Sequence, residues 1–257
     1  MAEEKRQFPT EVIDLPSKGY FYHTDNPLSS GQIEIKYMTA KEEDILTSAN
    51  LIQKGIVLDK LLQALVVTEG VNLDDVLIGD KNAIMVASRV LAYGKDYEFE
   101  YTDPSSNEKK THTVDLSSLE HKEIDFKKHT KGKNEFLFEL PKSKRKITFK
   151  ILTQREEKSI EAELKAMRKI TKGSGINPEI TTRLKSSIIS VDGNDDRQFV
   201  NNFVDNEFLS MDSFAYRTFL TSVTPDVNLS DMVEFDNGEF EEVSVPVTAR
   251  FFWPSAV

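Results

Sequence analysis

Few side chains in this sequence have the types and spacing that chemistry requires. The four histidines, His23, His112, His121 and His129, show neither metal-ligand spacing nor a nucleophile motif, so each is expected to lie at the surface. The absence of cysteine excludes disulfides, thiolate metal sites and cysteine nucleophiles. The histidines and cysteines therefore predict no catalytic centre and no cofactor.

The acidic turn Asp192-Gly-Asn-Asp-Asp196 is the best candidate for a metal site, because clustered carboxylates around a glycine suit hard cations. A calcium-binding loop of the EF-hand type needs a glutamate at its twelfth position, and Phe203 stands there when the count begins at Asp192. A turn that caps the following helix is the favoured interpretation. An enzyme that uses these carboxylates with a divalent cation stays open as a weaker hypothesis.

A lysine-rich segment between residues 122 and 150 could bind an anionic partner, either nucleic acid or an acidic protein surface. Lysine exceeds arginine there and no aromatic residue interrupts the basic loop, so stacking on bases is not expected. A solvated ribbon that lysine keeps soluble is the simpler interpretation. The residues predicted to contact a partner are Lys142, Lys144, Arg145 and Lys146.

The run Phe251-Phe252-Trp253-Pro254 near the end of the chain places three large aromatic residues together. Three consecutive side chains cannot all face one side of a strand. They either fill the chain's own core or anchor a partner, since phenylalanine and tryptophan are favoured at interfaces. The sequence leaves both alternatives open, and Phe251, Phe252 and Trp253 are therefore candidate partner-binding residues.

Composition limits the classes of function. The formal net charge is −10 and the pI is near 5.1, so the average surface repels a phosphate backbone. No apolar run is long enough to span a bilayer, and the first residues lack the apolar core of a signal peptide. The expected location is the cytosol of a cell.

Two kinds of periodicity alternate along the chain. A strand is expected within 31–38, and Thr39 with Glu42, then Thr153 with Glu156, form capping boxes that open helices. Helices are expected within 39–94, over 153–172, and at 179–189, 197–206 and 212–223. Hairpins are expected at 97–116, 135–151 and 232–245.

These elements predict an α+β fold in which two helical clusters are each followed by antiparallel β-hairpins. The predicted domains are residues 1–152, with a strand, a helical bundle and β-ribbons, and 153–257, with helices, a closing hairpin and the aromatic tail. The order of capping box, helices and hairpin occurs twice, which hints at a duplicated architecture, although no residue-level repeat is evident.

The motifs together resemble a family of baseplate hub assembly and structural proteins from T-even-like contractile-tailed bacteriophages. The similarity is carried in order by Leu15-Pro-Ser-Lys-Gly-Tyr20, Ile35–Leu46, Gly79-Asp-Lys-Asn-Ala83, Ala92–Tyr97, Ser190-Val-Asp-Gly193 and Val245–Pro254. Many members of that family carry a Cys-Pro-x-Cys knuckle at the tip of the first β-ribbon. Here Asp103 and Ser106 stand at those positions, so the ribbon-like insertions are expected to be free of zinc.

The resemblance implies a non-enzymatic role in building the hub at the tip of a contractile tail, either as a structural component or as an assembly chaperone. It implies partners among other tail or baseplate hub proteins, including the tape-measure protein, and no membrane. The implied location is the host cytoplasm during assembly and the virion baseplate. The alternative function is a nucleic-acid-binding accessory protein that uses the lysine-rich 122–150 ribbon.

Overall fold

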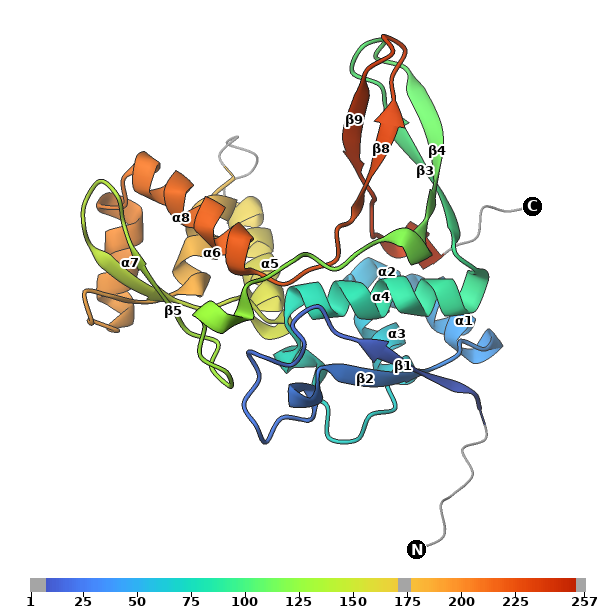
Figure 1. Ribbon diagram of the computed structural model, residues 1–257, viewed down its shortest axis with the longest axis horizontal. Helices are drawn as coiled ribbons and strands as arrows, with labels where there is room; N and C mark the ends of the chain where they lie inside the picture. The colour runs from blue at the N-terminus through green and yellow to red at the C-terminus, as the bar shows by residue number, and fades with distance from the viewer. Residues whose placement is uncertain (1–7, 171–176, 253–257) are drawn as a thin grey trace, which may run out of the picture.

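The computed structural model describes residues 8–170 and 177–252. It shows a helical body from which two β-ribbons rise together as a projecting arm (Figure 1). The fold is α+β, as the sequence predicts, and its sheets are small and antiparallel. Within the described residues no helix is both long and apolar enough to cross a membrane.

The first half of the chain runs from a hairpin through helices to a ribbon. The hairpin pairs β1 with β2 from Thr10↔Lys36 to Asp14↔Gln32, and the ribbon pairs β3 with β4 from Asp96↔Asp115 to Thr102↔Lys109. The elements are β1 (Thr10–Asp14), β2 (Gln32–Lys36), α1 (Ala40–Thr47), α2 (Ala49–Lys54), α3 (Val57–Leu65), α4 (Ile78–Tyr93), β3 (Asp96–Thr102) and β4 (Lys109–Asp115).

The second half repeats this order. Its hairpin β5–β6 gains a third strand, β7, and its ribbon pairs β8 with β9 from Ser230↔Ser244 to Glu234↔Phe240. The elements are β5 (Phe136–Glu139), β6 (Lys146–Phe149), α5 (Gln154–Ile170), α6 (Glu179–Ser187), β7 (Ile188–Val191), α7 (Arg197–Asn206), α8 (Ser210–Val223), β8 (Ser230–Glu234) and β9 (Phe240–Ser244).

The structure corrects the predicted helix at 179–189. That helix ends at Ser187, and the next four residues form β7, which pairs antiparallel with β6. β-branched Ile188, Ile189 and Val191 favour a strand, and the open edge of β6 supplies hydrogen-bond partners that the sequence alone could not show.

The duplicated architecture extends to individual residues, contrary to the expectation from the sequence. Glu42 accepts hydrogen bonds from the backbone N–H (3.0 Å) and hydroxyl (2.6 Å) of Thr39 and pairs with Lys36 (2.6 Å). In the second half Glu156 contacts Thr153 and Lys150 in the same way, with the same spacing of three residues. In each half this set of Lys–Glu–Thr contacts fixes the connection between a hairpin strand and the capped helix that follows it.

A second pair of contacts also repeats. Asp80 in the first turn of α4 accepts hydrogen bonds from the N–H and hydroxyl of Ser17, in the turn that follows Leu15-Pro16. Asp212 in the first turn of α8 accepts from the N–H groups of Lys142 and Ser143, in the turn that follows Leu140-Pro141. In both halves a buried aspartate at a helix N-terminus therefore holds the turn after the first hairpin strand.

The predicted division into residues 1–152 and 153–257 stays a prediction. The pairing of elements follows another division, into a unit from β1 to β4 and a unit from β5 to β9. Residue 152 lies inside the second unit, because β6 on one side of it hydrogen-bonds to β7 on the other.

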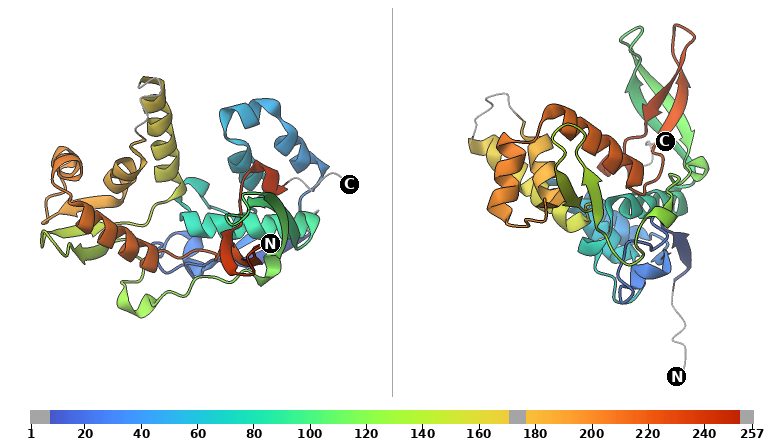
Figure 2. Two further views of the ribbon diagram at one scale, coloured as in Figure 1. Left: turned by 90° about the horizontal axis from the view of Figure 1, so that it is seen from above. Right: turned by 60° about the vertical axis from the view of Figure 1, so that its left-hand side comes forward.

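Helix α4 lies at the centre of the body and contacts both units. Gly79 allows the closest approach: a Cβ atom there would stand 1.9 Å from the carbonyl oxygen of Pro225. Asn82 on the next turn donates to the Asp226 carboxylate at 3.0 Å. The segment that leads from α8 to β8 thereby crosses the start of α4, which brings the two ribbons together on one side of the molecule (Figures 1 and 2).

Candidate functional site

The predicted partner residues of the lysine-rich turn fall into two groups. Lys142, Lys144 and Lys146 are exposed, and their side chains form no ion pair among the described residues. Arg145 differs, because it pairs with Asp192 at 2.7 Å and with Glu207 at 2.8 Å while its guanidinium covers the Phe203 ring. Arg145 therefore joins the β5–β6 turn to β7 and α7, and the three lysines remain available to a partner.

The acidic turn at 192–196 makes the contacts expected of a turn that caps a helix. Asp192 accepts from the backbone N–H of Lys146 and from Arg145, which together lower the pKa of its carboxyl. Asp196 accepts from the N–H of Phe199 and caps α7. Across residues 8–170 and 177–252, no group of three or more histidine, aspartate or glutamate side chains is arranged to hold a metal ion.

For two residues of the aromatic run near the C-terminus, burial decides between a core position and a partner contact. Phe251 and Phe252 are fully buried, and the Phe251 ring meets Tyr97 at 4.8 Å, edge to face. They fill the chain's own core at the base of the arm, so in this structure neither ring is open to a partner. Trp253, the third predicted residue, lies outside the described residues.

Arg89 holds this C-terminal segment in place, although no sequence motif indicates this role. Its buried guanidinium donates to the carbonyl oxygens of Phe251 (2.9 Å) and Gly94 (3.0 Å) and lies over the Tyr93 ring. Burial lowers the pKa of Arg89. A cation in the middle of an amphipathic helix is ordinarily solvated, so only the tertiary fold reveals that this one is a clamp.

The arm consists of the two ribbons packed with their apolar faces inward. Tyr97, Phe99 and Tyr101 of β3 point toward the second ribbon, where Tyr101 stacks on Phe235. His112 of β4 and Asp231 of β8 join the ribbons at 2.8 Å. Figure 1 shows the two ribbons rising together from the body to adjacent tips. The arm is thus a small two-layer β-structure with two solvent-exposed outer faces.

A hydrogen-bond network closes the tip of the arm. The buried Asp103 carboxylate accepts from the Ser105 hydroxyl (2.6 Å) and the Asp236 N–H (3.0 Å), and it pairs with Lys110 (3.2 Å). Lys110 also contacts the Asp236 side chain in the other ribbon. Burial would raise the pKa of Asp103, but these donors outweigh it and hold the pKa well below its usual value. At this tip a carboxylate therefore links the two ribbons.

The histidines are less uniform than the sequence suggested. His23 and His121 are exposed as expected, whereas His112 and His129 are half-buried. His112 has its partner in Asp231, and His129 packs against Phe21 and Phe136, where burial lowers its pKa. His23 and His121 thus lie at the surface as predicted, and His112 and His129 keep only part of their surface exposed.

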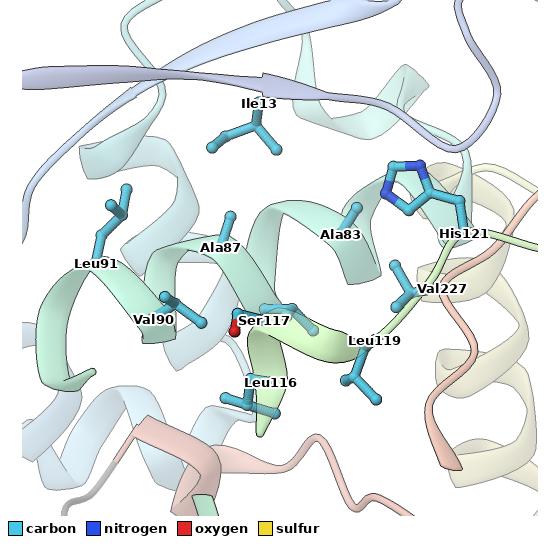
Figure 3. Close-up of a pocket in the computed structure, with 11 residues that line it drawn as sticks. Ile13, Ala83, Ala87, Val90, Leu91, Leu116, Ser117, Leu119, His121 and Val227 are labelled. Atoms are coloured by element: carbon cyan, nitrogen blue, oxygen red, sulfur yellow. The ribbon is translucent and has the colours of Figure 1, made fainter. Parts of the chain in front are cut away.

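An apolar groove of about 240 Å³ crosses the outer side of α4 (Figure 3). Ile13 of β1 forms one wall, and Leu119 and Val227 form the other, with Ala87 and Val90 of α4 at the floor. Its polar lining is limited to Ser117 and His121. This lining offers shape and apolar contact but no paired acid and base.

Charge is distributed unevenly. The two ribbons, residues 96–115 and 230–244, hold twelve aspartates and glutamates against two lysines, which equals the whole chain's formal net charge of −10. The rest of the chain carries as many basic as acidic side chains. Many of the arm's carboxylates, including Glu98, Glu100, Glu241 and Glu242, are exposed and form no ion pair within the part of the chain described. The arm is therefore a concentrated negative surface.

Comparison with models of protein families identifies the class to which this chain belongs. Residues 19–210 match the family described as T4 bacteriophage base plate protein. The chain belongs to this family, and it is therefore a phage baseplate protein. No curated protein and no solved structure matches it.

Proposed function

We propose that the chain is a baseplate hub protein, as a structural component or an assembly factor, and that it acts by binding other proteins and not by catalysis. The observation that carries the proposal is the arm. It projects from the body, is closed at its tip and base by buried polar contacts, and presents unpaired carboxylates on its outside. A rigid charged projection is suited to recognition of a complementary surface.

The titratable side chains that could serve catalysis make structural contacts, which favours binding over catalysis as the function. Asp103 and His112 join the two ribbons, and Asp192 joins the β5–β6 turn to β7 through Arg145. Each of these side chains has a structural partner within the chain.

The proposed partners are other tail or baseplate hub proteins, and the tape-measure protein is one candidate. The exposed Lys142, Lys144 and Lys146 offer a basic contact, and the arm offers an acidic one. An acidic protein surface suits the lysines better than nucleic acid, because the arm's charge opposes the approach of a phosphate backbone. The chain would assemble in the host cytoplasm and act at the virion's contractile tail.

Mass spectrometry of purified intact particles, with infected-cell lysate as the control, tests the role. Stoichiometric presence in particles is the result for a structural component. Abundance in the lysate with absence from particles is the result for an assembly factor. If a phage lacking the chain still forms complete baseplates at the normal rate, the proposal is wrong.

A variant pair tests whether the arm is the binding surface. Replacing Glu98, Glu100, Glu234 and Glu242 with glutamine removes four unpaired charges from the outer faces and leaves the packed inner faces unchanged. Co-purification of baseplate proteins should fall in that variant. Glu161→Gln with Glu163→Gln, at exposed positions of α5, removes charge away from the arm as a control and should leave co-purification unchanged.

A further inference from the structure

Strand β1 of the first hairpin has a free hydrogen-bonding edge. The N–H of Leu15 donates to the carbonyl of Gly31 at 2.8 Å, and from there every second residue of β1 bonds to β2. The N–H and C=O groups of Thr10, Val12 and Asp14 therefore point away from β2. Within residues 8–170 and 177–252 no segment pairs with them. β1 is thus an open edge to which a further strand can add.

The apolar groove over α4 lies beside this free edge. Ile13 forms its wall on β1, and no residue of β2 lines it, so the groove opens on the side of the free edge. Figure 3 shows β1 running beside α4, whose Ala83 and Ala87 lie on successive turns beneath the groove. Because side chains alternate between the two faces of a strand, a strand added to β1 would place every second side chain over the groove. Backbone hydrogen bonds together with apolar space for alternate side chains are what recognition of an extended peptide requires.

The internal repeat shows which kind of side chain the groove lacks. Counted from the two Leu-Pro turns and from the two buried aspartates, Ile13 corresponds to Phe138 and Ala87 corresponds to Phe219. In the second unit the rings of Phe138 and Phe219 stack at 4.7 Å. In the first unit both residues of the pair are smaller, and the groove lies between them. A large apolar side chain from a partner would therefore give the first unit the contact that the second unit makes within itself.

The charges around the groove are negative. Glu11 and Asp14 of β1 are exposed, as is Glu120, which lies between Leu119 and His121 of the opposite wall. None of these three carboxylates forms an ion pair within the part of the chain that the structure describes, and no lysine or arginine lines the groove. Two copies of β1 paired with each other would bring like charges together, which disfavours a second copy as the occupant. A segment that carries lysine or arginine is complementary.

We propose that an extended, basic segment of another protein adds to the free edge of β1 as a further strand and places a large apolar side chain in the groove beside Ala87. Figure 1 shows β1 on the side of α4 away from the arm. The inference therefore concerns a second binding surface, and it shares with the proposed function only the premise that the chain binds proteins.

A synthetic peptide of the sequence Lys-Val-Thr-Phe-Thr-Val-Lys is the probe. As a strand it presents valine, phenylalanine and valine on one face, and a lysine stands at each end. Fluorescence anisotropy of the labelled peptide with the full-length chain measures the dissociation constant. Saturable binding is expected, and replacing both lysines of the peptide with glutamate should weaken it about tenfold at low salt. Amide hydrogen exchange should slow on peptide binding in residues 10–14 of β1 and stay unchanged in residues 136–139 of β5.

Two variants of the chain test the edge and the groove separately. Val12→Pro removes an N–H that points away from β2 and should weaken peptide binding about tenfold. Leu137→Pro, at the corresponding exposed place on the edge of β5, is the matched control and should leave binding unchanged. Ala87→Phe should also weaken binding at least about tenfold, because its ring would take the place that Phe219 fills in the second unit. Thermal unfolding checks that each variant folds.

Three results would overturn the inference. The first is absence of peptide binding, and the second is binding that Val12→Pro leaves at full strength. The third is dimerisation of the chain in light scattering that Val12→Pro abolishes, because a second copy would then occupy the edge. A chain that fails to bind the peptide but is present in particles would refute this inference and leave the hub proposal intact.

Discussion

Replacing Gly79 with alanine tests whether the close crossing of α4 by the Pro225 segment fixes the fold. Helix propensity alone predicts a gain, since alanine is favoured over glycine within a helix by up to about 1 kcal/mol. The structure predicts the opposite sign. The added Cβ would lie 1.9 Å from the Pro225 carbonyl oxygen, where real Cβ contacts are not shorter than 3.0 Å, so the backbone must move by about 1 Å.

That movement is opposed by neighbouring contacts. Asp226 is held by Asn82 at 3.0 Å and by the N–H of Lys122 at 2.8 Å, so the segment cannot shift without loss of hydrogen bonds. Overpacking of this kind costs about 1–3 kcal/mol, and backbone contact places the case at the upper end. After the propensity gain, we expect a net loss of about 2 kcal/mol and a melting temperature lower by about 4–8 °C.

Urea denaturation followed by circular dichroism, with thermal unfolding beside it, measures this loss. Met211→Ala is the matched control, because Met211 holds the corresponding place in α8 and is exposed. It should change stability by less than about 0.5 kcal/mol. If Gly79→Ala were as stable as the natural protein or more so, the inferred crossing of the two units would be refuted.

Three further predictions follow from buried polar contacts. Asp80→Ala and Asp212→Ala should each cost about 3 kcal/mol or more in denaturant unfolding, because each leaves hydrogen-bond donors of the turn without an acceptor. Exposed Asp195→Ala should cost almost nothing, and a cost for Asp80→Ala or Asp212→Ala as small as that of Asp195→Ala would disprove the equivalent role of the two aspartates. Burial would raise the pKa of Glu42, but hydrogen bonds from Lys36 and Thr39 lower it from 4.5 to about 2. The contribution of Glu42 to stability is therefore complete above about pH 4.5 and is lost as the pH falls toward 2. Glu42→Gln should flatten that part of the profile of stability against pH. Arg89→Met should speed tryptic cleavage after exposed Arg250 at least about tenfold by releasing the Phe251 carbonyl, and an unchanged cleavage rate by mass spectrometry would argue against the clamp.

Local signals in the sequence predicted most elements, because their causes are local. The Thr39 and Thr153 capping boxes open helices at the expected places, and the Asp236-Asn-Gly238 turn joins β8 to β9. The sequence pattern does not predict strand β7, because its partner strand β6 is distant in sequence. Short β-branched runs take the structure that their neighbours offer, and periodicity cannot supply those neighbours.

The candidate surfaces were only partly visible for the same reason. Composition predicts the exposed lysines of the β5–β6 turn, but it cannot separate Arg145 from them, because the partners of Arg145, Asp192 and Glu207, are far along the chain. The sequence does not predict the acidic arm, because its negative charge is divided between two segments that are more than a hundred residues apart. Only the contact between the ribbons concentrates it.

The internal repeat explains how two similar units come to have different roles. The first unit places α4 at the centre, where Gly79 and Asn82 accept the chain that returns from the second unit. The corresponding residues of α8, Met211 and Phe214, are exposed, and in the described part of the chain no segment crosses the start of α8 as Pro225 crosses the start of α4. Because both ribbons rise beside α4, the acidic arm and this uncovered helix end up at different ends of the molecule (Figure 1). A duplicated architecture thereby gives the molecule two ends of different character, although both units follow the same order of hairpin, helices and ribbon.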